Sequence, residues 1–341
     1  MKLIVTGGAG FIGSAFVRLL LSRGGDEIVV LDKLTYAGNL ENLDPVKDSS
    51  GFRFVRTDIV DSAAVSTLVA GEKPDAIVHF AAESHVDRSI DGPRVFIETN
   101  VLGTFSLLEA VRAHGVPRFV HVSTDEVYGS IDEPHDADET WPLKTSSPYS
   151  ASKASSDLLV QSYFHTFHLP VTITRASNNY GPYQFPEKLI PLMISNALEG
   201  KPLPIYGDGM QVRDWLYVDD HCRGIDAVLR KGREGEVYNI GGNCSLPNHE
   251  VVDRIIAATG ARRDQIRYVA DRPGHDRRYA ITTEKLEEQT GWRPLTGFDA
   301  GLAGTVQWYR DNGGWVERVK SGEYKNFYER NYANRRVGGA E

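Results

Sequence analysis

The feature that most constrains the fold is a glycine-rich turn at the start of the chain. A short apolar run, Leu3–Thr6, leads directly into the residues TGGAGFIGS, and a helical pattern follows from Phe11. Glycines at Gly7, Gly10 and Gly13 let the backbone turn tightly from a strand into a helix and approach a ligand closely. Because the N-terminus of that helix offers free N–H groups, the pattern predicts a phosphate-binding turn at the first strand of a parallel sheet.

Short apolar segments alternate with helical patterns over the first 180 residues. After Leu3–Thr6, the segments expected to be strands are Glu27–Asp32, Phe52–Thr57, Ala76–Phe80, Arg118–Ser123 and Val171–Ala176. The expected helices between them include Phe11–Ser22, Thr99–Ala113 and Pro148–Phe167. Continuous apolar strands joined by helices indicate a parallel sheet that is covered on both faces. We therefore predict the α/β class, with a doubly wound parallel (Rossmann) sheet and a smaller C-terminal substrate-binding domain.

The regular alternation of strand and helix patterns ends after about Tyr180. Prolines cluster at Pro182, Pro186, Pro191, Pro202 and Pro204, and the regular segments become shorter. We expect residues 1–180 to form mainly the sheet domain and residues 181–334 to form mainly the smaller domain. One apolar segment, Glu236–Ile240, is a candidate strand that returns to the main sheet. Residues 335–341 are predicted to be a mobile tail.

Composition excludes several classes of function. The net charge of −8 gives no global support for binding nucleic acid, although local Lys and Arg side chains can still bind a small anion. No stretch reaches the roughly 18 apolar residues of a membrane helix, and the N-terminus lacks a signal-peptide pattern. The two cysteines, Cys222 and Cys244, match no metal or redox spacing, and the histidines form no metal-binding pattern. We expect a cytoplasmic protein with no metal, membrane or nucleic-acid partner.

The end of the second predicted strand indicates which dinucleotide is bound. Asp32 lies there, 19 residues after Gly13. A carboxylate at this place accepts hydrogen bonds from the ribose hydroxyls of adenosine and repels a 2′-phosphate. This favours NAD over NADP, although the adjacent Lys33 would tolerate a phosphate. The ends of the next two strands are expected to lie against the adenine, ribose or pyrophosphate, unless they are simply packed strand ends; they carry Asp58, Ile59, Phe80, Ala81 and Ala82.

A candidate catalytic pair lies on the predicted helix Pro148–Phe167. Tyr149 and Lys153 are four residues apart and so share one face of that helix. The ordinary pKa of tyrosine, about 10, is too high for a general base at neutral pH. A nearby ammonium and a nicotinamide cation both favour the phenolate and would lower that pKa. A Tyr-x-x-x-Lys pair occurs often by chance, but its place after a glycine turn and a βαβ series favours a catalytic role.

Two adjacent carboxyl groups follow the predicted strand Arg118–Ser123. Thr124, Asp125 and Glu126 would face the active site there, with the Thr124 hydroxyl near the reacting substrate oxygen and Tyr149. A plain oxidoreductase does not need two carboxyl groups, whereas an elimination needs one group to remove a proton and another to protonate the leaving oxygen. Two close carboxyl groups would also split their pKa values, so that one stays protonated. From the spacing alone, a solvent-facing helix cap remains the alternative.

Taken together, these motifs resemble the dTDP-glucose 4,6-dehydratases of the extended short-chain dehydrogenase/reductase family, over nearly the whole chain. The resemblance is carried by TGGAGFIGS (6–14), LDKLTYAGN (31–39), AAESHVDRSI (81–90), STDEVYG (123–129), PYSASKASSD (148–157), NNYGPYQFPEKLIP (178–191), PIYGDGMQVRDWLYVDDH (204–221) and DRPGHDRRYA (271–280). The first and fifth segments mark the superfamily. The Asp-Glu pair after Thr124 marks the dehydratase branch, because 4-epimerases of this fold lack it.

The resemblance implies an NAD-dependent lyase that converts dTDP-glucose to dTDP-4-keto-6-deoxyglucose and water. Tyr149, assisted by Thr124 and Lys153, would remove the proton from the sugar 4-hydroxyl while hydride passes from C4 to NAD. Glu126 would then take the C5 proton, and Asp125 would protonate the departing 6-hydroxyl. Hydride would return to C6 while C5 is reprotonated. Because NAD is regenerated in each cycle, it is expected to stay tightly bound.

The same resemblance implies which residues bind the two ligands. The expected cofactor residues are Gly7, Gly10, Phe11, Ile12, Gly13, Asp32, Lys33, Thr35, Asp58, Ile59, Phe80, Ala81, Ala82, Ser84, Thr99, Tyr149, Lys153 and Asn179. The expected substrate residues are Ser84, Thr124, Asn178, Lys188, Leu189, Pro204, Ile205, Tyr206, Arg213, Asn248, Arg272 and His275. Arginine suits a diphosphate because it offers planar, charge-assisted donors. Taken singly, a loop arginine is more often a solvated charge, and Tyr206 is as readily a core aromatic as a ring stacked on the pyrimidine.

Several alternatives stay open within the same fold. Thymine and uracil differ by one methyl group, worth about 1–3 kcal/mol in a pocket, so a UDP-sugar is a rival substrate. A GDP-mannose 4,6-dehydratase, a UDP-hexose 4-epimerase or decarboxylase, and a non-catalytic NAD-binding protein are further alternatives. Asp125 and Glu126 disfavour the epimerase, and the complete set of Thr124, Tyr149 and Lys153 disfavours the non-catalytic protein. The resemblance also implies a homodimer that forms through the helices Thr99–Ala113 and Pro148–Phe167.

Overall fold

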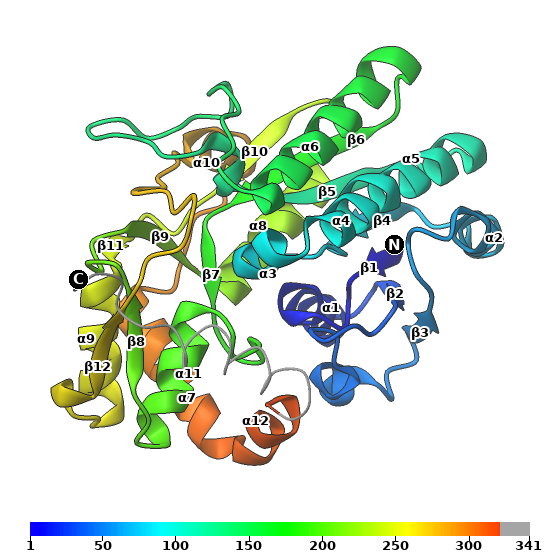
Figure 1. Ribbon diagram of the computed structural model, residues 1–341. Coiled ribbons are helices and arrows are strands. Elements are labelled where there is room, and N and C mark those ends of the chain that lie inside the picture. The colour runs from blue at the N-terminus through cyan, green and yellow to red at the C-terminus, as the bar shows by residue number, and fades with distance from the viewer. Residues whose placement is uncertain (321–341) are drawn as a thin grey trace.

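In a computed structural model, which describes residues 1–320, the chain forms a central parallel sheet with helices on both faces and a smaller part beside it (Figure 1). The order of the seven strands is β10-β6-β5-β4-β1-β2-β3. They are β1 (Lys2–Thr6), β2 (Glu27–Asp32), β3 (Phe52–Arg56), β4 (Ala76–His79), β5 (Phe119–Thr124), β6 (Val171–Ala176) and β10 (Val237–Ile240). Each neighbouring pair is parallel. The predicted doubly wound α/β fold is therefore confirmed.

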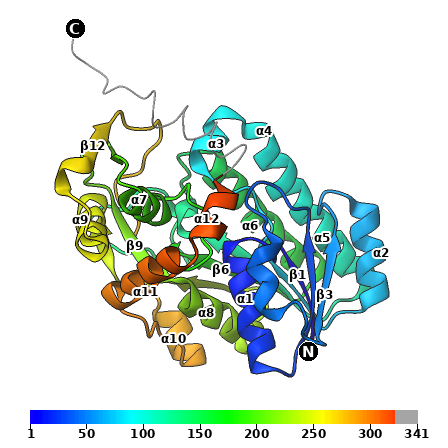
Figure 2. The ribbon, with the colours of Figure 1, turned by 90° about the horizontal axis from the view of Figure 1, so that it is seen from below.

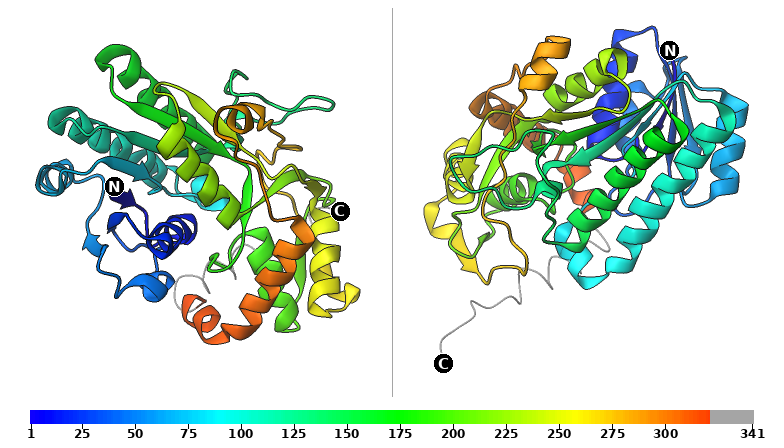
Figure 3. Two further views of the ribbon diagram at one scale, coloured as in Figure 1. Left: turned by 180° about the vertical axis from the view of Figure 1, so that it is seen from behind. Right: turned by 90° about the horizontal axis from the view of Figure 1, so that it is seen from above.

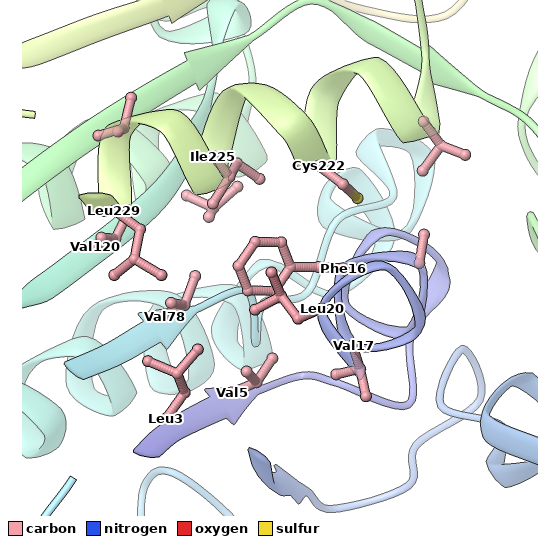
Figure 4. Close-up of a cluster of buried hydrophobic side chains, with 14 of the residues drawn as sticks. Leu3, Val5, Phe16, Val17, Leu20, Val78, Val120, Cys222, Ile225 and Leu229 are labelled. Atoms are coloured by element: carbon pink, nitrogen blue, oxygen red, sulfur yellow. The ribbon is translucent and has the colours of Figure 1, made fainter. Parts of the chain in front are cut away.

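Two helices, α1 (Phe11–Arg23) and α8 (Val218–Lys231), cover one face of the sheet. Figure 4 shows Phe16 and Leu20 of α1 packed among Val5, Val78 and side chains of α8. The other face is covered by α2 (Ser62–Glu72), α5 (Gly103–His114) and α6 (Pro148–Phe167), whose apolar side chains form a second core. Figure 2 shows α1 and α2 on opposite sides of β1 and β3. Both faces of the strands are thus buried, which explains their continuous apolar sequences.

The helix expected over Thr99–Ala113 is one part of a longer helical segment. This segment begins with α4 (Pro93–Phe96), continues through one wide π-type turn, η2 (Ile97–Leu102), and ends with α5. Pro93 occupies the first helical position, where its missing N–H costs nothing. A glycine stands at the junction because a Cβ on Gly103 would overlap the side chain of Ile59. The sequence pattern did not reveal this early start.

The smaller part contains two short sheets and several helices around a separate apolar core. Its sheets are β11-β9-β7 and β12-β8. Their strands are β7 (Asn178–Tyr180), β8 (Leu203–Tyr206), β9 (Val212–Tyr217), β11 (Ser245–Pro247) and β12 (Ile266–Val269). The helices are α7 (Leu189–Leu198), α9 (Asn248–Thr259), α10 (Glu284–Thr290), α11 (Phe298–Asp311) and α12 (Gly313–Val319), with α10 lying against α8 and β10.

The chain crosses between the two parts more than once, as the two further views in Figure 3 show. The strand expected over Glu236–Ile240 is β10, which pairs with β6 at the edge of the main sheet. The remaining short helices are η1 (Leu40–Val46), α3 (Val86–Asp91), η3 (Asp125–Tyr128) and η4 (Arg263–Gln265). The exact division at residue 180 stays a prediction, and the predicted tail, residues 335–341, lies outside the described residues.

Two further observations concern possible partners. Within residues 1–320, every helix is too short or too polar to cross a lipid bilayer. Across the same residues, no three His, Cys, Asp or Glu side chains converge on a point where a metal ion would sit.

Candidate active site

One cavity lies where the strands of the main sheet end and the smaller part begins. It is lined by residues that follow β1, β2, β3, β4, β5 and β6, and by residues 178–279 of the smaller part. Ligands in open α/β sheets bind at this carboxyl edge. All residues that the sequence nominated for catalysis, cofactor binding or substrate binding line this one cavity. The role of each residue toward a ligand stays a prediction.

The glycine turn after β1 forms the floor of one end of the cavity. Gly7 has a φ of +68°, and a Cβ there would lie 2.6 Å from the backbone nitrogen of Ala81. A Cβ on Gly13 would overlap the carbonyl oxygen of Gly7. Helix α1 begins after Gly10 with no side chain capping it, so its first N–H groups remain available to an anion. Only glycine allows this packing of strand, turn and helix.

Asp32, at the end of β2, is held by the backbone of the same turn. The amide of Ala9 donates to Oδ2 at 3.0 Å, and the amide of Leu34 donates to Oδ1 at 2.8 Å. Burial raises the pKa of Asp32, and these two backbone hydrogen bonds and the charge of Lys33 oppose that effect. The Nζ of Lys33 lies 3.3 Å from Asp58 Oδ2. Because Lys33 is already paired, it is a poor partner for a 2′-phosphate, which strengthens the preference for NAD.

The cavity fits a dinucleotide by a second criterion as well. Thr99 Oγ1, Asn178 Oδ1 and Asn248 Oδ1 are buried and have no hydrogen-bond partner among residues 1–320. All three residues line the cavity. A buried polar atom without a partner costs free energy unless a ligand or water satisfies it. Together with the glycine turn and Asp32, these atoms match what NAD and a nucleotide sugar would need.

Tyr149 and Lys153 lie on the first turns of α6, facing the end of β5. The Nζ of Lys153 donates to the carbonyl oxygen of Val122 at 2.8 Å. Burial lowers the pKa of Lys153 to about 8, and the charge of Asp157 opposes this. Burial raises the pKa of Tyr149, the charge of Glu126 raises it further, and a hydrogen bond with Thr124 lowers it. Burial and the charge of Glu126 therefore oppose the phenolate form of Tyr149, so a base at this position needs a positive charge close by.

Thr124 serves two purposes at the end of β5. Its hydroxyl oxygen accepts from the amide of Glu126 at 3.2 Å and thereby caps the short helix η3. The same hydroxyl donates to Asp125 Oδ1 at 3.3 Å and bonds with the hydroxyl of Tyr149. The capping role left open by the sequence thus exists, but it belongs to Thr124. The two acids are not turned to solvent, since both line the cavity.

The environments of the two carboxyl groups differ. Asp125 is 2% exposed, and its Oδ2 is buried without a hydrogen-bond partner among the described residues. Burial raises the pKa of Asp125 well above its ordinary value, and the charges of Glu126 and Asp214 raise it further. The protonated form of Asp125 is therefore favoured over the carboxylate, as a proton donor requires. Glu126 is less buried, and its charge raises the pKa values of Lys188 and Arg272.

The far end of the cavity carries cationic side chains that are held by other protein groups. Arg272 Nη1 lies 3.4 Å from Asp87 Oδ1, and the hydroxyl of Tyr206 donates to Asp87 Oδ2 at 2.8 Å. Lys188 Nζ donates to the carbonyl oxygen of Ser84 at 2.7 Å. Burial lowers the pKa of Lys188. This end can accommodate a diphosphate, because it concentrates positive charge in a desolvated place.

Arg213 is anchored from β9 beside the same end. Its guanidinium donates to the carbonyl oxygens of Val212 and Asp276, at 2.8 and 2.9 Å. It also lies over the ring of Tyr279, 4.2 Å from the ring centre. Nearby, His275 Nδ1 lies 2.6 Å from Asp271 Oδ1, and burial lowers the pKa of His275 to about 4.

Several residues that line the cavity were not singled out in the sequence. They include Asp87, Gln184, Glu187, His221 and Tyr279. All five fall inside the segments that carry the family resemblance. Nothing in the local sequence marks these residues as parts of the site, because none of them lies at a fixed spacing from the glycine turn or the Tyr-x-x-x-Lys pair. What reveals them is contact, such as the hydrogen bond between His221 Nδ1 and Asn179 Oδ1 at 2.9 Å.

Comparisons with known proteins agree on one kind of relative. Residues 4–305 match the family described as GDP-mannose 4,6 dehydratase. The dTDP-glucose 4,6-dehydratase of Shigella flexneri is 53% identical and aligns with 98% of this chain and 100% of its own. Among solved structures, DesIV (dTDP-glucose 4,6-dehydratase) from Streptomyces venezuelae with NAD and TYD bound is 55% identical, with a TM-score of 0.92. That match covers 94% of this chain and 100% of DesIV.

The fold alone does not separate dehydratases from epimerases. The UDP-glucose 4-epimerase of Thermus thermophilus, in complex with NAD, has a TM-score of 0.85 to this chain. It is only 34% identical, over 92% of this chain and 100% of its own. The choice therefore rests on the higher sequence identity to the dehydratases and on the carboxyl pair Asp125 and Glu126.

Proposed function

The chain belongs to the dTDP-glucose 4,6-dehydratase family, and we propose that it converts dTDP-glucose to dTDP-4-keto-6-deoxyglucose and water. It is an NAD-dependent lyase, since the sugar is oxidised and reduced again within one cycle. The observation that carries the proposal is the meeting of Tyr149, Lys153, Asp125 and Glu126 in one cavity beside the glycine turn. An oxidation needs the first two, and only an elimination needs the last two.

The first step requires a base at the sugar 4-hydroxyl. Tyr149 is the proposed base, and its hydrogen bond with Thr124 places a second hydroxyl beside the same proton. Lys153, held by the carbonyl of Val122, supplies the ammonium that stabilises the phenolate. NAD bound in this cavity would supply the redox chemistry, as the hydride acceptor and donor. The residues proposed to hold NAD are those of the glycine turn and the strand ends that follow it, together with residues of η2, α6 and β7: Gly7, Gly10, Phe11, Ile12, Gly13, Asp32, Lys33, Thr35, Asp58, Ile59, Phe80, Ala81, Ala82, Ser84, Thr99, Tyr149, Lys153 and Asn179.

The second step removes water across C5 and C6. Glu126 is the proposed base for the C5 proton, which the 4-ketone makes acidic. Asp125 is the proposed acid for the departing 6-hydroxyl, and its raised pKa supports this, since a group that donates a proton must hold one at the working pH. The carboxyl that is more exposed, Glu126, is thus the proposed base, and the buried carboxyl whose Oδ2 has no hydrogen-bond partner among the described residues, Asp125, is the proposed acid.

The enzyme must also bind the nucleotide diphosphate of the substrate. Arg213, Arg272 and Lys188 are the proposed cationic partners, with His275 beside them. Leu189, Pro204, Ile205 and Tyr206 are proposed to bound the thymine, and Ser84, Asn178 and Asn248 to hold the sugar or phosphates. The unpartnered buried oxygens of Asn178 and Asn248 support this, because a bound substrate would satisfy them.

We propose that the enzyme is a homodimer, as the family resemblance implies. Support comes from large apolar side chains that are exposed on the helices expected to pair. On η2 and α5 these are Ile97, Leu102 and Phe105, and on α6 they are Leu158 and Phe167, each between 43% and 56% exposed. A patch of this kind on an isolated chain marks an interaction surface. We also propose a cytoplasmic site of action, supported by two cysteines that form no disulfide.

The test is to incubate the purified protein with dTDP-glucose, without added cofactor, and to follow the sugar nucleotide by mass spectrometry. The expected result is loss of one water, abolished in Tyr149→Phe and slowed in Glu126→Gln. UDP-glucose and GDP-mannose run in parallel decide between the nucleotides. Water loss from one of these alone would overturn the dTDP substrate, and turnover unchanged after replacement of both Asp125 and Glu126 would overturn the dehydratase.

A further inference from the structure

A buried group of side chains lies behind Lys153 and has no part in the chemistry proposed so far. We call it the Asp157 cluster. It comprises Asp157, Arg175, Tyr128, His121 and Asn239, and it joins α6 to η3 and to the strands β5, β6 and β10. Each of these residues is at most 2% exposed. Charged groups buried this deeply are costly unless they are paired.

The cluster is connected by short, directed contacts. Arg175 Nε donates to Asp157 Oδ2 at 2.8 Å, and its Nη1 donates to the hydroxyl oxygen of Tyr128 at 3.0 Å. The Tyr128 hydroxyl in turn donates to Asn239 Oδ1 at 2.8 Å. These bonds fix one carboxylate oxygen of Asp157. The other, Oδ1, lies 3.4 Å from His121 Nε2, and no better-placed donor reaches it among residues 1–320.

Asp157 stands one helical turn after Lys153 and on the same face of α6. Two cations are therefore buried here, Lys153 and Arg175, with Asp157 as the one carboxylate of the cluster. Among the groups that act on the pKa of Lys153, burial lowers it and Asp157 is the charge that raises it. Arg175 keeps its charge under all ordinary conditions. Of the two cations, Lys153 is therefore the one that can lose its proton if the carboxylate of Asp157 is removed.

We propose that Asp157 is a positioning residue for the oxidation step, which keeps the buried Lys153 in its ammonium form and so keeps Tyr149 competent as the base. The proposal deepens the proposed function and rests on it, because the ammonium matters only if Tyr149 takes a proton from a substrate. Asp157 contacts neither ligand in this account. It acts through Lys153 alone.

Other ionisable groups around Lys153 do not replace Asp157. His121 on β5 and His79 on β4 are neutral at pH 7, because burial lowers the pKa of the first to about 4 and that of the second well below its ordinary value. Burial favours the protonated form of Asp125, which carries no charge to act on Lys153. Glu126 is the remaining carboxylate on η3, and its charge acts on Tyr149 and on the cations of the substrate end.

Asp157 also has a smaller effect of the opposite kind. Its charge raises the pKa of Tyr149, but this effect ranks behind burial and behind the charges of Glu126 and Asp125. For Lys153, in contrast, Asp157 is the one charge named as a cause of the pKa shift. Removing the carboxylate should therefore change the protonation of Lys153 more than that of Tyr149.

The test follows cofactor reduction by its absorbance after rapid mixing of the holoenzyme with dTDP-glucose, over a range of pH. All proteins carry Asp125→Asn and Glu126→Gln, so that the two elimination carboxyls do not contribute to the pH profile. In the pH–rate profile, the alkaline limb is the fall in the rate of cofactor reduction at high pH, where Lys153 loses its proton. In Asp157→Asn, this limb should move to lower pH by at least about one unit, which corresponds to a tenfold change in the ratio of ammonium to amine. Asp157→Glu should restore the limb.

Two further variants separate charge from packing. Arg175→Met removes the ion-pair partner of Asp157 and keeps the carboxylate, so its alkaline limb should not move to lower pH. Tyr128→Phe removes the two hydrogen bonds that the Tyr128 hydroxyl makes with Arg175 and Asn239 without changing any charge, and its limb should stay in place. If Asp157→Asn alone does not fold, the double variant Asp157→Asn/Arg175→Met removes both charges, and its limb should lie below that of Arg175→Met.

The outcomes discriminate clearly. An unshifted limb in Asp157→Asn, with only a lower plateau, would overturn the proposal, because a purely structural role lowers the rate at every pH. Shifts in the same direction for Asp157→Asn and Arg175→Met would overturn it as well. Absence of any cofactor reduction while Asp157 is intact would overturn the proposed function and this inference together.

Discussion

The two halves of the cavity differ in whether backbone groups or side chains form their walls. The half proposed to hold the cofactor, called the cofactor half, consists largely of backbone: the glycine turn after β1 and the ends of β2, β3 and β4, all within the first 84 residues. The half proposed to hold the substrate, called the substrate half, consists of side chains from distant segments, 84–87, 178–193, 204–215, 248 and 272–279. Backbone groups are fixed by the fold itself, whereas the side chains are held by one another.

The difference teaches how each half can respond to its ligand. In the cofactor half, a Cβ at Gly7 or Gly13 would overlap backbone atoms that cannot move aside. In the substrate half, Arg272 and Tyr206 share Asp87, and Lys188 binds the carbonyl of Ser84. Substrate binding must share or replace such contacts. We therefore expect changes in the first half to be severe, and changes in the second to be graded.

The largest effect is expected from Gly13→Ala. The added methyl group would overlap the carbonyl oxygen of Gly7, so the turn cannot keep its shape and resident NAD should be lost together with turnover. NAD released from the denatured protein, quantified by chromatography, is the measurement. Gly71→Ala is the matched control, because a Cβ at this helical glycine has no atom within 4 Å. Full NAD content in Gly13→Ala would contradict the rigid description of this half.

A smaller but still large effect is expected from Asp125→Asn. The amide keeps the size of the side chain but cannot protonate the departing 6-hydroxyl, so kcat should fall by roughly 10²–10⁴-fold while NAD content stays the same. Steady-state kinetics with dTDP-glucose provides the measurement. Water loss should slow while cofactor reduction on mixing persists. Equal slowing of both steps would show that Asp125 does not act as the acid.

A graded effect is expected from Arg213→Lys in the substrate half. Lysine keeps the charge but loses the planar fork that binds two carbonyl groups and stacks on Tyr279. KM for dTDP-glucose should rise by about tenfold, which corresponds to about 1.4 kcal/mol, with a smaller change in kcat. Loss of NAD in this variant would break the distinction between the halves.

The smallest effect concerns stability in mild acid. His79 is buried between the hydroxyls of Thr6 and Thr104, at 2.7 and 3.0 Å, and burial holds its pKa well below 6.5. Its folded pKa is below its unfolded one, so the unfolded state binds the extra proton and stability falls as pH drops below about 6.5. In His79→Gln, that dependence should weaken by about 1.4 kcal/mol per pH unit, measured by urea unfolding between pH 6 and 5. An unchanged slope would contradict the neutral assignment of His79.

Most of the cofactor half was predictable from the sequence, because its signals are local. Gly7, Gly10 and Gly13 lie within one turn, and Asp32 follows at a fixed distance along the next strand. Alternating apolar runs located the strands, and β5 differs from its predicted bounds by one residue at each end. The capping box of Ser147 and Ser150 fixes the start of α6, which agrees with the predicted Pro148.

The substrate half could be predicted only through family resemblance. Arg272 and Asp87 are 185 positions apart in the chain, and no local pattern brings them together. The Asp157 cluster escaped prediction for the same reason, since its acid and its arginine lie on a helix and a strand whose pairing follows from the tertiary fold. The state of Tyr149 was also out of reach, because its pKa depends on the burial of the whole site.

The central claim is that the two halves serve one reaction in which the same hydride leaves C4 and returns to C6. The most direct measurement uses dTDP-glucose that carries deuterium at C4, without added NAD, and locates the label in the product by NMR. The account predicts deuterium at C6 of the 4-keto-6-deoxy sugar in nearly every product molecule. Product without deuterium at C6 would contradict it, because the hydride would then have another source.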